Sequence, residues 1–171
     1  MGKATANGSP GEAAAPSVLL LGAASGCVER RLGAVYRATS YYVDGPTGRF
    51  ALRVNQSRLE VNALASEYGV DAWAFITAYN PGSVLAPAEL NEARQEELER
   101  AVTEAGYRFC RGEGKADDSA WQPEPSLLIL GIGEEEAAEL ARRFGQAAFV
   151  FGERGQAARL VWTNIESEGA C

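Results

Sequence analysis

The stretch from residue 72 to residue 162 alternates short apolar runs with longer amphipathic segments, and this alternation most restricts the fold. Short runs rich in branched and aromatic residues predict strands, whereas apolar residues three and four apart predict helices. The resulting order is strand, helix, strand, strand, helix, strand, strand, which contains the split βαβ arrangement of ferredoxin-like sheets. The predicted strands are "AWAFITAYN", "YRFCRGEG" and "SLLILGIG", the helices are "PAELNEARQEELERAVTEAG" and "EEEAAELARRFG", and the closing hairpin is "AAFVFGERGQAARLVW".

The segment before residue 72 predicts a second hairpin and a short helix. "AVYRATSYYV" and "RFALRVN" are joined by "DGPTG", whose Gly and Pro are typical of a hairpin connection. "SRLEVNALASEYG" predicts a helix that Ser57 caps and Gly69 ends. Together these elements predict an α+β fold, a mixed or antiparallel sheet with its helices mainly on one face.

The chain suits a single domain flanked by two tails. Its 171 residues are 46% apolar and 23% charged, which are ordinary globular values. Residues 1–32 are predicted to be a mobile tail, residues 33–164 the globular domain, and residues 165–171 a C-terminal tail. Within the first tail, the apolar run at 17–27 fits a strand, a tail or a degenerate leader, and these alternatives stay open.

Histidine is absent, which limits the available chemistry. Without it the chain lacks the usual general base near neutral pH and most zinc or iron sites, so we expect neither a metal nor another cofactor. Cys27, Cys110 and Cys171 are too scattered for a disulfide framework, which favours reduced thiols in the cytoplasm. The net charge of −7 argues against nucleic acid, and no apolar stretch has the length of a membrane span.

The candidate site is the crossover "ITAYNPGSVLAPAELNEAR", where a predicted strand turns into a predicted helix. In that helix a stripe that includes Leu98, Ala101 and Ala105 projects back onto Arg94 and Asn91. A core-facing guanidinium needs acceptors, and these can be loop carbonyls, a carboxylate or a bound anion. The arrangement therefore predicts either a structural anchor for the loop or a small anion pocket. The full apolar stripe is Leu90, Leu98, Ala101, Val102 and Ala105.

Glu124 is a further candidate because Pro123 and Pro125 force it into an extended conformation before a buried strand. It can pair with Arg94 or Arg53, or act as a general base if an apolar wall raises its pKa. The candidate ligand-binding residues are Thr77, Asn80, Ser83, Asn91, Arg94 and Glu124.

Several segments resemble a bacterial domain family of unknown function. These are "ITAYNPGS", "NEAR", "EPSLLILGI" and "ARRFGQAAFVFGE", which are similar to that family's I-T-A-(Y/W)-N-P segment, its N-x-x-R and its late F-G-Q. The resemblance spans about residues 36–162 and implies a small stand-alone domain, but it implies no reaction.

Two functions remain open from the sequence. The first is a non-enzymatic binding or regulatory module that holds a small anionic ligand or a protein partner near the 77–94 crossover. The second is a hydrolase or transferase acting on a small anionic substrate, with Glu124 as base and Arg94 as charge stabiliser. A cleft shared by Glu124 and Arg94 favours the enzyme, whereas filled contacts favour the module.

Overall fold

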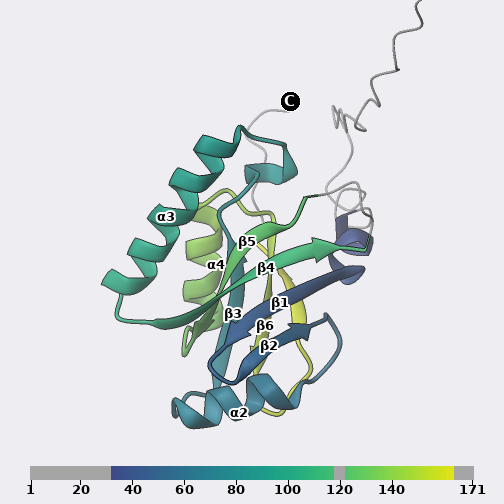
Figure 1. Cartoon of the computed structure of the whole chain (residues 1–171), viewed down its shortest axis with the longest axis vertical. Coiled ribbons are helices and arrows are strands. Elements are labelled where there is room, and N and C mark those ends of the chain that lie inside the picture. The colour runs from purple at the N-terminus through teal and green to yellow at the C-terminus, as the bar shows by residue number, and fades with distance from the viewer. Residues whose placement is uncertain (1–31, 118–121, 164–171) are drawn as a thin grey trace, which may run out of the picture.

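The computed structural model of the protein describes residues 32–117 and 122–163, and Figure 1 shows a twisted sheet with helices packed against it. The strands form one seven-stranded sheet in the order β2-β1-β4-β5-β3-β6-β7, and every neighbouring pair is antiparallel. The strands are β1 (Thr39–Gly45), β2 (Gly48–Leu52), β3 (Ala72–Thr77), β4 (Arg108–Ala116), β5 (Glu124–Leu130), β6 (Ala148–Glu153) and β7 (Arg159–Trp162). The helices are a short one at residues 32–37, α2 (Leu59–Glu67), the short 3-10 helix η1 (Pro81–Ser83), α3 (Ala88–Glu104) and α4 (Glu134–Arg143).

Helices cover both faces of the sheet, with α3 and α4 on one face and α2 on the other. In β3, Ala74 and Ile76 belong to the core cluster that contains the apolar residues of α3 and α4. The alternate residues Trp73 and Phe75 belong to the cluster that contains those of α2. Because successive side chains of a strand point to opposite faces, β3 is buried on both sides. The predicted α+β class is confirmed, and the sheet is antiparallel with α3 and α4 together on one face.

The strand order places β5 between β3 and β4. Since β5 is antiparallel to both, β3 and β4 run parallel and α3 connects them across the sheet face. The likeness to ferredoxin-like sheets as a fold family stays a prediction.

The two sides of the curled sheet are joined by the segments next to its edge strands. Asn55 follows β2, and its backbone N–H donates to the carbonyl of Ala158, just before β7, at 2.7 Å. The N–H of Ala158 in turn donates to the carbonyl of Gln56 at 3.0 Å. These two hydrogen bonds join the segments next to β2 and β7, which are the two edge strands of the sheet.

Three local predictions were wrong. Residues 34–37, predicted as the start of a strand, belong instead to a helix at 32–37, so β1 begins at Thr39. Ser57 does not cap α2, because the cap position is Arg58 and no side chain caps this helix. In α3 the predicted stripe is displaced, since Leu90 is 50% exposed and Ala105 is exposed while Asn91 and Gln95 are buried. The helix stops at Gly69, Gly106 and Gly145 are confirmed, each with a positive φ just after its helix.

The predicted tails fall outside the described residues, apart from Leu32, which is helical. Cys27 and Cys171 lie there too. Cys110 on β4 is half-buried, and burial raises the pKa of its thiol, with a smaller contribution from the charge of Asp44. None of the helices in the described ranges has the length and apolar character needed to cross a bilayer.

Candidate functional site

The crossover begins where β3 leaves the sheet. The hydroxyl of Thr77 donates to the carbonyl of Pro125 on β5 at 2.7 Å and accepts from the N–H of Tyr79 at 3.0 Å. The N–H of Ala78, which follows the last β3 residue, donates to Oε1 of Gln95 at 3.0 Å. Side chains therefore replace the sheet partners that the chain loses as it turns away.

Asn80 is the centre of the turn. Its backbone is left-handed, with φ of 48°, a conformation that Asn tolerates better than most residues. Its side-chain oxygen accepts from the N–H of Ala86 at 3.0 Å and from Nδ2 of Asn91 at 2.9 Å. Its side-chain nitrogen donates to Glu124 at 2.6 Å. One buried side chain thus joins the loop, α3 and the start of β5.

Asn91, in the first turn of α3, completes this junction. Its oxygen accepts from the backbone N–H of Asn80 at 2.9 Å, and its nitrogen also donates to the carbonyl of Ala86 at 3.2 Å. Asn91 is only 4% exposed, so these bonds satisfy both its donor and acceptor groups away from water.

Arg94 joins the crossover to the end of α4. Its Nε donates to the carbonyl of Ala78 at 3.2 Å, and one terminal nitrogen donates to the carbonyl of Phe144 at 2.6 Å. The guanidinium carbon lies 6.0 Å from the centre of the Phe144 ring. The hydrogen-bond acceptors of the Arg94 guanidinium are therefore backbone carbonyls, which is the first of the possibilities that the sequence leaves open.

The segment after α4 supports the same loop. Nε2 of Gln146 donates to the carbonyl of Tyr79 at 2.8 Å, and the N–H of Gly82 donates to the carbonyl of Gly145 at 2.7 Å. Gly145 has a φ of +69°, and a Cβ there would approach Cβ of Pro81 at 2.9 Å. This close approach explains why the F-G-Q segment needs glycine at its middle position.

Glu124 lies at the start of β5 in a group of hydroxyls. Burial raises the pKa of Tyr36, a hydrogen bond with Ser83 lowers it, and the charge of Glu124 raises it further. Burial also raises the pKa of Tyr41 far above its ordinary range, with smaller contributions from Tyr36 and Glu124. The hydroxyl of Tyr41 donates to the carbonyl of Tyr36 at 2.8 Å. Glu124 is thus close enough to these phenols to favour their neutral form.

The structure divides the six predicted residues into connected groups. Asn80, Asn91 and Glu124 form one hydrogen-bonded chain, and Thr77 joins it through Pro125, the neighbour of Glu124. Ser83 lies close enough to Tyr36 to lower the pKa of that phenol, and Arg94 donates to carbonyls beside the junction. Arg53, offered as a partner for Glu124, instead pairs with Asp117 at 2.9 Å.

The sequence prediction missed Gln95 as a member of the network. It is 7% exposed, and its Nε2 has no hydrogen-bond partner among the described residues. The available signal was its spacing, because Asn91, Gln95, Leu98 and Val102 follow one another at four and three residues on one helix face.

Metal ligands do not gather in the described parts of the chain, where no group of three His, Cys, Asp or Glu could hold an ion. The hydrogen-bonded groups of the crossover are amides, carbonyls and hydroxyls, together with the guanidinium of Arg94 and the carboxylate of Glu124, and they bond to one another.

Residues 76–149 match the family model described as "Protein of unknown function (DUF3293)". The expected resemblance to a family of unknown function is thereby confirmed over this range, which contains the crossover, α3 and α4. No curated protein and no solved structure matches the chain.

Proposed function

We propose that the chain is a non-enzymatic binding module whose recognition surface is the loop that the crossover network holds. The observation that carries this proposal is the exposure of three large apolar side chains on residues 84–90. Val84 is 67% exposed, Leu85 65% and Leu90 50%. Neighbouring exposed apolar residues on one short segment are typical of an interaction surface.

The backbone that presents these side chains is fixed on both sides of Ala86. The N–H of Ala86 donates to the side-chain oxygen of Asn80, and the carbonyl of Ala86 accepts from the side-chain nitrogen of Asn91. A loop that is already held in place loses little conformational entropy when a partner binds. The polar network therefore acts as a support, and the apolar residues outside it make the contacts.

A protein partner is favoured over a small anionic ligand. Nε and one terminal nitrogen of Arg94 already donate to backbone carbonyls, which leaves fewer of its N–H groups for an anion. Glu89 and Glu92 on the first turns of α3 add negative charge beside the loop. The expected partner presents an apolar surface with basic residues around it, and we place the interaction in the cytoplasm, without nucleic acid.

The hydrolase or transferase remains the second candidate, supported by the hydroxyls of Tyr36 and Ser83 near Glu124. For this reaction Glu124 would have to release Asn80 and accept a proton from substrate or water. Hydrolysis of p-nitrophenyl esters and phosphates by the parent but not by Glu124→Gln would favour this candidate.

A photo-crosslinking experiment tests the binding module. A benzoylphenylalanine at position 85 should give a discrete protein adduct in cells that make the chain, and Val84→Ser should reduce its yield. The same probe at position 104, an exposed site at the other end of α3, is the matched control. Equal adduct patterns from positions 85 and 104 would contradict the proposed surface.

A further inference from the structure

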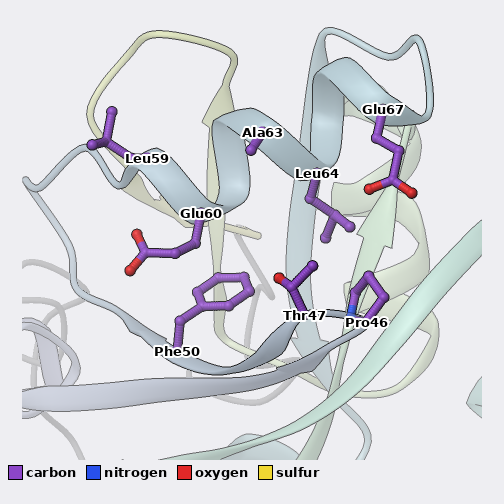
Figure 2. A pocket seen from close by; sticks show the side chains of 8 residues that line it. All are labelled: Pro46, Thr47, Phe50, Leu59, Glu60, Ala63, Leu64 and Glu67. Carbon is purple, nitrogen blue, oxygen red and sulfur yellow. The ribbon is translucent and has the colours of Figure 1, made fainter.

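A groove on the other face of the sheet lies between α2 and the β1–β2 hairpin. Its cavity has a volume of about 290 Å³. Figure 2 shows that Phe50 on β2 and Leu64 on α2 point toward each other across the groove. Pro46 and Thr47 line the groove from the β1–β2 turn. The groove is far along β1 from the helix at 32–37 and shares no residue with the crossover.

Two carboxylates border the apolar part of the groove. In Figure 2, Glu60 hangs beside the ring of Phe50 and Glu67 lies above Pro46. They are seven residues apart on α2, which separates their Cα atoms by about 10 Å. Neither carboxylate forms an ion pair or hydrogen bond with another residue in the described ranges.

The nearby arginines are engaged with other groups. Arg49 pairs with Glu113 at 2.5 Å, and Nε of Arg58 donates to the carbonyl of Ala51 at 2.8 Å. The positive end of the α2 dipole lies near Glu60, whereas the negative end lies near Glu67. The Glu67 end should therefore attract a cation more strongly than the Glu60 end.

We propose that this groove binds an aliphatic diamine, a ligand with two ammonium groups joined by an apolar chain. The methylene chain packs on Phe50 and Leu64, and the ammonium groups lie beside Glu60 and Glu67. An extended eight-carbon diamine spans roughly 11 Å between its nitrogens, using single-bond lengths near 1.5 Å. The ring of Phe50 adds a face that attracts cations, and the net charge of −7 favours a cationic ligand.

NMR titration of the full chain with 1,8-diaminooctane at low ionic strength tests this proposal. Signals of Phe50 and Leu64 should shift saturably, and added salt should weaken binding because the carboxylates are exposed. Glu60→Gln and Glu67→Gln should each weaken binding about two- to fivefold, with the larger loss for Glu67→Gln. Glu104→Gln on α3 is the matched control and should leave binding unchanged.

Four further ligands separate the contributions of charge, chain and peptide character to binding. Octylamine has one charge and should bind about two- to fivefold more weakly, while 1,8-octanediol and suberate should not saturate the groove. Equal binding of the diol and the diamine would overturn the proposal, as would equal losses in Glu104→Gln and Glu67→Gln. Binding of a Lys-Leu-Leu-Lys peptide without binding of the diamine would also overturn it, because the ligand would then be a protein segment.

Discussion

Asn80 and Asn91 hydrogen-bond each other reciprocally, the side-chain oxygen of Asn91 accepting from the backbone of Asn80 and its nitrogen donating to the side chain of Asn80. Both distances are 2.9 Å and both residues are buried. This pair fixes the start of α3 against the turn that leaves β3. The polar residues of the crossover are thus explained first by the backbone groups that the turn would otherwise leave unpaired.

Asn80→Asp should destabilise the protein by about 2–3 kcal/mol at neutral pH, because it removes the donor to Glu124 and places two carboxylates together. Part of the loss should be recovered in acid, where a shared proton restores a donor. Chemical denaturation at several pH values measures this. Asn55→Asp is the matched control, since Asn55 also has a positive φ but is exposed. Equal losses in the two variants would show that backbone conformation, not the network, is responsible.

Gly145→Ala should cost more than Gly106→Ala. Both glycines have a positive φ, which costs an alanine about 1–2 kcal/mol. At Gly106 no atom lies within 4 Å of the added Cβ, whereas at Gly145 Cβ of Pro81 lies at 2.9 Å. The contact with Pro81 should add roughly 1–3 kcal/mol to the loss of unfolding free energy in Gly145→Ala. Unfolding free energies of the two variants give the comparison, and equal values would contradict the close packing of α4 on η1.

Alkaline pH should destabilise the protein through Tyr41. Its folded pKa is raised, chiefly by burial, so the unfolded chain releases this proton first as pH rises. The stabilising contribution is complete below the unfolded pKa of about 10 and is lost above it. Tyr41→Phe should therefore flatten the decline in unfolding free energy above about pH 10, where the unfolded chain has released the proton and the folded protein still holds it. An unchanged decline would show that other groups cause the alkaline loss.

The sequence predicted most elements because their periodicity is strong, as in β5 and α4. It failed where polar residues occupy core positions. On α3, Asn91 and Gln95 face the protein core, whereas Leu90 faces solvent. The side-chain oxygens of Asn91 and Gln95 accept from backbone N–H groups of Asn80 and Ala78, which follow the end of β3. Residues 34–37 were wrongly predicted as strand because "AVYR" has apolar residues that suit either a strand or a helix.

The candidate site was only partly predictable for a related reason. The spacing of Asn91 and Arg94 from Leu98 indicated that both lie near the core side of α3. Nothing in that spacing identifies the carbonyl of Phe144, because this acceptor is fifty positions further along the chain and is brought near only by the packing of α4. Long-range acceptors of this kind need the tertiary structure.

The unfolding free energy of Arg94→Ala, measured with and without phosphate, tests most directly whether the crossover is a structural support. We expect Arg94→Ala to lower the unfolding free energy by about 2–4 kcal/mol, because the carbonyls of Ala78 and Phe144 lose their donor, and we expect phosphate not to stabilise the parent. Arg94→Lys should recover little, since one ammonium cannot reproduce the fork, while Arg100→Ala on the exposed side of α3 should change stability by less than about 0.5 kcal/mol. If Arg94→Ala is as stable as the parent and phosphate stabilises only the parent, Arg94 is not a structural support and the crossover is an anion site.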